Sequence, residues 1–390
     1  MKRQTCFSAF VLAGLMAAAL PANAWAAYSD TPEFAKTPQE WERLRDNTLE
    51  YDEIEDLVHE YNITVLNNRT SYRDYLGDTS DDVAQRYRDA AQELWDSIQY
   101  PDDPADVSYA TMLMAAQMSE TQARNLEQQA DNNVDDSQSI FLQYEQVEKG
   151  LVLSTKLNLI SYCQKQLTDR LNQENKQLLE ALYQSAQVQA GVGNATQMDV
   201  LTARQTLEQL DSTIISSEKE TQTLKQKICL ATGWNYDADP VFGALPEIDP
   251  AVVDTVNLSA DQALALENNY TLKINRRKHE NSTDAATKEN LEKTIYDNQQ
   301  KISSDITTKY QSLLNARAAY QLALAEQDIA IQNQAAMERK FATGSASRLE
   351  YQQESYNAAS KTTAAENAKL ALLTAWETYQ GAVNGLATAS

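Results

Sequence analysis

The longest stretch without a helix-breaking residue constrains this chain more than any other feature. From Ser259 to Thr343 the sequence contains neither glycine nor proline, and one continuous helix over this stretch would be about 130 Å long. The whole chain of 390 residues has only 10 Gly and 8 Pro, too few for the closely spaced turns of a β-sandwich. We therefore expect an all-α fold of very long antiparallel helical hairpins, with little or no β structure.

Apolar residues in the long stretches recur at the spacing of packed helices. Two rows step by seven residues and a third alternates steps of three and four, which is the pattern of a coiled-coil seam. The rows are Ile306, Leu313 and Tyr320; Tyr310, Arg317, Leu324 and Ile331; and Leu207, Leu210, Ile214, Ser217, Thr221, Leu224 and Ile228. Their polar members indicate loosely packed seams.

The first residues have the pattern of an export signal. Lys2 and Arg3 precede an apolar run over 7–20, and the cleavage patterns Ala-Asn-Ala and Ala-Trp-Ala follow over 22–26, so we expect 1–26 to be a signal peptide. The run is shorter than the roughly 20 residues that span a bilayer as a helix. The net charge of −23 disfavours nucleic acid as a partner, because the phosphate backbone is also negative.

The sequence that follows the export signal indicates two tandem repeats. Three prolines and a glycine cluster between 240 and 250, which predicts a Pro/Asp-rich linker over 233–257. This linker separates a first helical repeat over 28–232 from a second over 258–386.

Two short segments occur once in each repeat. Residues 62–69 align without gaps with 269–276, each beginning at an asparagine. Residues 193–199 align with 344–350 through matched Gly, Ala, Thr/Ser, Met/Leu and Asp/Glu positions. The two matches in the same order indicate an internal duplication.

The second segment has the chemistry of a tight turn between two helices. A glycine after a long helix takes the left-handed conformation that ends it, and Gly193 and Gly344 stand there. Thr196 and Ser347 can cap the next helix, with an acid three residues later completing a capping box. We therefore expect hairpin tips near 193–196 and 344–347.

On these residues the chain resembles the TolC-like outer membrane efflux protein family, with an export signal, two repeats, Asn62 and Asn269, and a Gly-x-x-[Ser/Thr]-x-x-[Asp/Glu] turn in each repeat. The resemblance implies a homotrimer whose helices form a hollow α-barrel, a passive conduit for small molecules or peptides. It also implies tips that dock a periplasmic-type adaptor protein attached to an inner-membrane pump. The tip residues are Gly193, Asn194, Ala195, Thr196, Asp199, Gly344, Ser345, Ala346, Ser347 and Glu350.

The resemblance also assigns single residues near the second tip. Acids just beyond this tip commonly ring the entrance in the family, and Glu350 stands at that place, whereas Gln353 one turn on is uncharged. The family often has a tyrosine three residues before the second glycine, and here that residue is Phe341. The link that a tyrosine hydroxyl makes there cannot form in this chain.

The chain departs from the family where each repeat normally carries a pair of β-barrel strands. Residues 81–99 and 105–130 of the first repeat have helical patterns, and the second has only polar residues at 281–284. Two interpretations stay open. One is a TolC-like duct in the cell envelope, at the outer membrane if the resemblance carries over fully. The other is a barrel-less secreted coiled-coil scaffold or adaptor-binding protein at the extracytoplasmic surface.

An enzyme is disfavoured by the scarcity of catalytic side chains. His59 and His279 are the only histidines, and we expect both on solvated helices without partners at metal-ligand or triad spacing. The acidic residues around Asp131 and Asp135–Asp136 lack the glycine and final glutamate of a calcium loop. We therefore expect no cofactor and no metal, and interpret these acids as solvated.

Two cysteines follow the export signal, Cys163 and Cys229. Their midpoint is Thr196, so they should lie level in the first hairpin. They can form a disulfide in an oxidising compartment or stay as two buried thiols.

Overall fold

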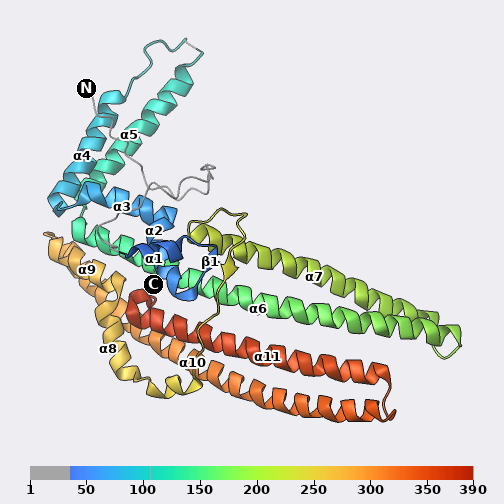
Figure 1. Ribbon diagram of the computed structural model, residues 1–390. Helices are drawn as coiled ribbons and strands as arrows, with labels where there is room; N and C mark the ends of the chain where they lie inside the picture. The colour runs from blue at the N-terminus through green and yellow to red at the C-terminus, as the bar shows by residue number, and fades with distance from the viewer. Residues whose placement is uncertain (1–35, 106, 390) are drawn as a thin grey trace. The chain divides into compact units, whose positions relative to one another are not determined.

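The computed structural model describes residues 36–105 and 107–389, and the expected signal peptide over 1–26 lies outside them (Figure 1). Two compact units make up the chain. The long-helix unit comprises Arg43–Leu66, Glu145–Leu272 and the chain from Tyr296 onwards. The arm unit comprises Asn67–Tyr144 and Lys273–Ile295, with the described residues up to Glu42.

Four long helices dominate the long-helix unit: α6 (Ser137–Gly191), α7 (Gln197–Ala231), α10 (Ala285–Ala342) and α11 (Arg348–Gly381). α6 and α7 form one antiparallel hairpin, and α10 and α11 form a second (Figure 1). The all-α fold of long antiparallel hairpins is thereby confirmed.

Ion pairs and hydrogen bonds join these helices along their length. Lys176 of α6 lies 2.8 Å from Asp211 of α7, and Lys361 of α11 lies 2.7 Å from Glu326 of α10. The two hairpins also touch, because Gln164 of α6 donates to the carbonyl oxygen of Asn367 in α11 at 3.3 Å. These pairs are exposed and contribute little each, so apolar burial holds the helices together.

The apolar seams lie where the sequence rows place them, with one exception. Leu210, Ile214 and Ile228 are buried in α7, as are Ile306 and Leu313 in α10. The exception is the second α10 row, whose later members, Leu324 and Ile331, are 41% and 48% exposed. The prediction that Leu324 and Ile331 lie in a packed seam is therefore wrong for the single chain.

The long stretch without glycine or proline is not one helix. It divides into α8 (Leu258–Asn268), α9 (Tyr270–Asn281) and α10. Asn269 has an extended backbone, with φ −56° and ψ 121°, and a carboxylate oxygen of Asp284 accepts the Thr287 N–H at 2.7 Å. Polar side chains that bond the backbone can therefore end a helix where no glycine or proline does.

Short elements complete the long-helix unit and lead into the arm unit. α1 (Pro38–Leu44), η2 (Tyr51–Glu53), α2 (Ile54–Tyr61) and α3 (Ile63–Tyr75) come before the arm, and η3 (Pro250–Thr255) and η4 (Ala382–Leu386) come later. The described residues contain one strand pair, β1 (Thr48–Leu49) parallel to β2 (Val241–Phe242), with Thr48 opposite Val241. β2 and η3 lie within the expected linker over 233–257.

A helical hairpin, here called the arm, fills the first-repeat position where the resemblance implies strands. It consists of α4 (Ser80–Ser97) and α5 (Tyr109–Asp131) (Figure 1). Their contact is built largely from alanines: Ala84, Ala90, Ala91, Ala116, Ala123 and Ala130 are buried. The corresponding place in the second repeat holds only residues 282–284, between α9 and α10.

The two ends of the arm meet. The Ser137 N–H donates to the carbonyl oxygen of Asp78 at 3.0 Å, and the Asn133 side chain donates to the carbonyl oxygen of Ser80 at 2.8 Å. α4 begins with a capping box in which Thr79 and Asp82 bond each other's backbone N–H. The chain thus leaves and re-enters the rest of the arm unit at one place.

Candidate functional site at the hairpin tips

The tip of the first hairpin is a short turn closed by its own backbone. Gly193 has φ 77°, and the Asn194 N–H donates to the carbonyl oxygen of Gln189 at 2.8 Å, which is the bond of a Schellman helix end. α7 then begins with a capping box. The Thr196 N–H donates to Asp199 Oδ2 at 2.7 Å, and the Asp199 N–H donates to Thr196 Oγ1 at 3.2 Å.

The tip of the second hairpin repeats this construction. Gly344 has φ 72°, and the Ser345 N–H donates to the carbonyl oxygen of Lys340 at 2.8 Å. The Ser347 N–H donates to Glu350 Oε2 at 2.7 Å, and the Glu350 N–H donates to Ser347 Oγ at 3.2 Å. Each turn thus has the backbone that its sequence predicts.

Both tips carry an ionised carboxylate in open solvent. Hydrogen bonds from the backbone and side chain of Thr196 lower the pKa of Asp199, and those from Ser347 lower the pKa of Glu350 in the same way. Both acids therefore stay charged at neutral pH while they hold the turns. Ala195 and Ala346 are the small residues at the centres of the turns.

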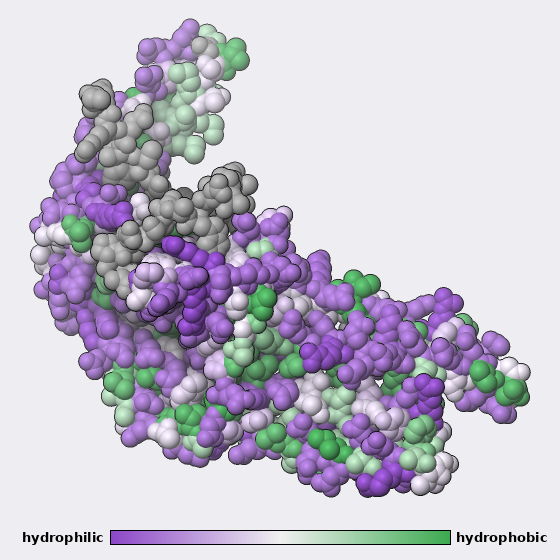
Figure 2. Space-filling model, viewed as in Figure 1, coloured by the Kyte–Doolittle hydropathy of each residue, from purple (hydrophilic) through white to green (hydrophobic). Residues whose placement is uncertain are grey.

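Exposed apolar side chains flank the first tip. Val188, Val192, Met198 and Leu201 are between 57% and 69% exposed, and Figure 2 shows a hydrophobic cluster at this end of α6 and α7. Sequence reasoning missed this surface, although apolar residues on both sides of a capped turn were the signal for it. Such a cluster is typical of a surface that another protein covers.

The second tip presents an aromatic pair. Phe341 and Tyr351 stack with ring centroids 5.0 Å apart and planes 14° apart, and Phe341 is 40% exposed. The two tips therefore share a backbone design and differ in the side chains that they offer.

The asparagine that begins the first matched segment of each repeat bonds the end of that repeat. Asn62 donates to the carbonyl oxygen of Ala231, the last residue of α7, at 2.8 Å. Asn269 donates to the carbonyl oxygen of Ala387, just after η4, at 2.8 Å. Each asparagine also accepts an N–H at the start of the following helix, at 2.9 Å for Asn62 and 3.0 Å for Asn269. The matched segments thus have one structural role.

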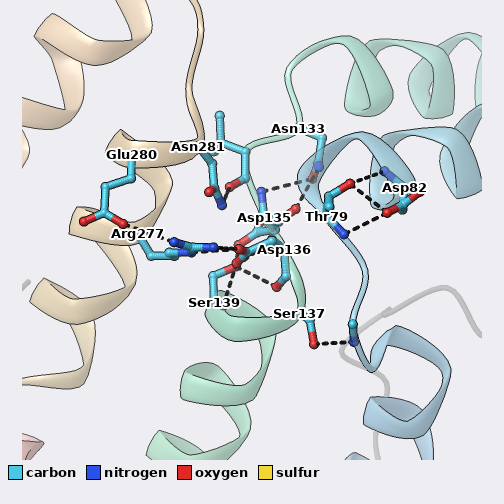
Figure 3. A network of polar contacts seen from close by, with 12 residues as sticks. Thr79, Asp82, Asn133, Asp135, Asp136, Ser137, Ser139, Arg277, Glu280 and Asn281 are labelled. Atoms are coloured by element: carbon cyan, nitrogen blue, oxygen red, sulfur yellow. Dashed lines mark hydrogen bonds and ion pairs between the residues drawn. The ribbon is translucent and has the colours of Figure 1, made fainter.

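A polar network in the arm unit joins the residues that precede α6 to α9 (Figure 3). Arg277 Nε donates to Asp136 Oδ2 at 2.7 Å, Lys278 Nζ donates to Asp135 at 3.0 Å, and Asn281 donates to the carbonyl oxygen of Val134 at 3.0 Å. Asp136 is only 4% exposed. The expectation that these acids are solvated is therefore wrong for Asp136.

The charge of Asp136 is held by its partners. Burial on its own raises the pKa of this carboxyl, but hydrogen bonds from Arg277, from the Ser139 N–H and from Asn281 outweigh burial, and the pKa is lowered. A cleft of about 460 Å³ borders the network and is lined in part by Tyr72, Phe141 and Arg277.

Comparison with solved structures identifies the architecture. No family model and no curated protein matches the chain. The crystal structure of the CmeC outer membrane channel of Campylobacter jejuni is similar over 97% of this chain and 95% of that chain, with a TM-score of 0.54 and 10% identity. The fold is TolC-like. A membrane protein from Pseudomonas aeruginosa is also similar, over 85% of this chain and 92% of that one, with a TM-score of 0.51 and 11% identity.

The two cysteines of the TolC-like chain are free thiols. Cys229 is fully buried and Cys163 is partly buried, and burial raises the pKa of both thiols. Whether they pair in an oxidising compartment stays a prediction. Both thiols are among the groups that affect the pKa of Tyr162, which burial raises.

The histidines of the TolC-like chain differ in their surroundings. His59 Nδ1 lies 2.6 Å from Glu148 Oε1, and its side chain is 14% exposed. The expectation of a solvated position is therefore wrong for His59, because α2 packs this residue against α6. His279 is more exposed and lies 3.1 Å from Glu292. Within the described ranges, no helix is both long and apolar enough to cross a membrane.

Proposed function

We propose that this chain is the duct component of a tripartite export system, a passive conduit outside the cytoplasm for small molecules or peptides. The observation that carries the proposal is the pair of matched tips, each a glycine turn with a capping box at the end of a long hairpin in a TolC-like fold. The fold supports a hollow assembly of helices, and the tips supply the surface that a partner protein can hold.

The proposed duct is a homotrimer. Leu322 and Ile329 of α10 are 62% and 59% exposed, and Leu324 and Ile331 are 41% and 48% exposed. Each pair is spaced by seven residues, which is the repeat of a helix seam. A single chain leaves both rows without cover, and neighbouring copies would bury them.

The proposed partners are a periplasmic-type adaptor and the inner-membrane pump to which it is attached. The adaptor docks at Gly193, Asn194, Ala195, Thr196, Asp199, Gly344, Ser345, Ala346, Ser347 and Glu350. Apolar residues beside the first tip and the Phe341–Tyr351 pair at the second support a protein as occupant. Three copies of Glu350 would give the entrance a negative ring, because its lowered pKa keeps each carboxylate charged.

A change at both turn glycines tests the docking role. A Cβ at Gly193 or Gly344 meets nothing within 4 Å, so Gly193→Val with Gly344→Val acts through the left-handed backbone, at about 1–2 kcal/mol per turn. We expect the exported double variant to stay helical and assembled, to lose co-purification with the adaptor, and to leave cells retaining ethidium. The measurements are affinity capture and dye efflux in cells that lack the wild-type gene.

Gly150→Val is the matched control. Gly150 lies inside α6 and a Cβ there also meets nothing within 4 Å, so this variant should capture the adaptor and export the dye normally. Full capture and efflux by the double tip variant would contradict the docking role.

The alternative function is a secreted scaffold or adaptor-binding protein of the cell envelope. The helical arm favours it, because α4 and α5 stand where the resemblance implies strands. Cells that lack the wild-type gene also distinguish the two functions. A scaffold would capture the adaptor through the tips, yet its loss would leave the efflux of ethidium unchanged.

A further inference from the structure

The two hairpins of the long-helix unit differ in how far they extend. The side chain of Gln164 in α6 bonds the carbonyl oxygen of Asn367 in α11 at 3.3 Å, so these two residues lie level. From Gln164, α6 continues for 27 residues to its end at Gly191, whereas Asn367 lies only 19 residues after Arg348, where α11 begins. At about 1.5 Å per residue, the first tip therefore extends about 12 Å beyond the second (Figure 1).

The first tip, which protrudes, is apolar. Residues 181–198 include no charged side chain. Val188 and Val192 are four residues apart on α6, and Met198 and Leu201 are three apart on α7, so each pair lies on one face of its helix. All four side chains are between 57% and 69% exposed. These four residues are here called the apolar tip.

The second tip, which is set back, carries a group of cations. Arg339, Lys340 and Arg348 are all exposed and are here called the basic tip. No acid lies among them, and Glu338 and Glu350 stand at either end of the group. The two tips thus share the backbone of their turns, but they offer a partner opposite kinds of surface.

We propose that the adaptor which holds the duct has an apolar socket for the apolar tip and an acidic rim that meets the basic tip. This inference rests on the proposed docking at the tips and names the chemistry of the partner. The offset of the hairpins matches such a partner, because the protruding tip enters the socket while the other tip stays at the rim. Protein interfaces are commonly built in this way, with an apolar centre and a polar surround.

Charge complementarity decides what the rim carries. A neutral rim would take three cations out of water without giving them partners, and a basic rim would repel them. The chain as a whole has a net charge of −23, so an acidic rim is repelled by most of the duct and attracted to the basic tip. Complementary charge of this kind sets the orientation and the rate of association.

The capped turns favour the same kind of docking. Each turn is closed by a left-handed glycine and a capping box, so its backbone is already held in one conformation. A surface that is ordered before binding loses less conformational entropy when the partner arrives. Discrimination between partners then depends on the side chains of the two tips.

The socket is tested with the purified adaptor that the wild-type chain captures in the test of the proposed function. Its binding to the immobilised full-length exported chain is measured by biolayer interferometry. Met198→Glu with Leu201→Glu should weaken binding by about 100-fold or more, because each carboxylate would be buried in an apolar socket. Met198→Leu with Leu201→Met is the matched control and should bind as the wild type does. Equal binding by these two variants would overturn the socket.

The rim is tested by reversing charge at the second tip. Arg339→Glu with Arg348→Glu should bind about tenfold or more weakly at about 50 mM salt, and the loss should shrink at about 500 mM salt, because salt screens exposed charges. Arg339→Lys with Arg348→Lys keeps both charges and should bind as the wild type does. Undiminished binding by the charge-reversed variant, or a loss that salt does not change, would overturn the acidic rim.

The outcomes also separate this inference from the proposed function. Circular dichroism and light scattering should show every variant to be as helical and as assembled as the wild type, since all the substituted side chains are exposed. Loss of binding in Gly193→Val with Gly344→Val, but in neither of the glutamate variants, would overturn only the chemistry proposed here. Binding that survives every change at the tips, or no capture by the wild type, would contradict the docking role and this inference together.

Discussion

At the scale of single residues, Asn62 and Asn269, the asparagines matched between the repeats, each bond several backbone groups at once. Asn269 is fully buried and bonds the carbonyl oxygens of Gly385 and Ala387 and the N–H of Leu272. One amide side chain thus ties the start of α9 to the end of the second repeat. The backbone conformation at the start of α9 and at the end of the second repeat therefore depends on the Asn269 side chain.

We expect Asn269→Ala to lower the free energy of unfolding by about 2–4 kcal/mol, because it leaves three buried backbone groups without a partner. Asn268→Ala is the matched control, since Asn268 is less buried and makes one bond of 3.3 Å, to Val383. Urea denaturation followed by circular dichroism measures both. Equal losses for the two variants would mean that the clamp is not specific to Asn269.

At the scale of elements, Asp136 and Arg277 join segments that lie 141 positions apart in the sequence. The pKa of Asp136 is lowered in the folded chain, so its contribution to stability is complete above the ordinary value of about 3.9. That contribution is lost as the pH falls below this value and through the folded pKa. Amides in the first turns of α6 and the last turns of α9 should therefore lose protection from hydrogen exchange below about pH 4, measured against the intrinsic exchange rate at each pH.

Asp136→Asn should remove this part of the acid dependence and lower the protection of the same amides at neutral pH. Asp131→Asn is the control, because the Asp131 side chain is 76% exposed and lies 3.7 Å from its partner. An acid dependence that is unchanged in Asp136→Asn would assign it to other carboxylates.

The tips and the polar network show which features the sequence predicts and which it does not. The tips were predictable because Gly193 and Gly344 lie within seven residues of the caps that they precede, and local backbone chemistry decides their conformation. The pairing of Asp136 with Arg277, the burial of His59 and the break at Asn269 were not, because each depends on a partner distant in sequence. The helical arm followed from its pattern, but the contact between its ends did not.

At the scale of the whole molecule, the α10 rows should matter for assembly far more than for the single chain. Leu322→Glu with Ile329→Glu places charges at positions that are 62% and 59% exposed, where surface substitutions usually change stability by less than about 0.5 kcal/mol. We expect this variant to stay helical and to be monomeric by light scattering. Gln321→Glu with Gln332→Glu is the matched control, because it changes exposed polar residues of the same helix, and it should leave assembly intact. Assembly of the Leu322→Glu/Ile329→Glu variant would show that the rows are not an interface.

The closed ends of the arm have a consequence for how such a chain can change over time. The backbone enters the arm at Ser80 and leaves it at Asn133, whose side chain bonds the Ser80 carbonyl oxygen at 2.8 Å. The arm is therefore a cassette, that is, a segment that can be inserted or removed as one piece. Lineages can lengthen, replace or lose it without rerouting the long helices, since its two junctions already touch. The second repeat, with only 282–284 at the same place, displays the form of a repeat that carries no cassette.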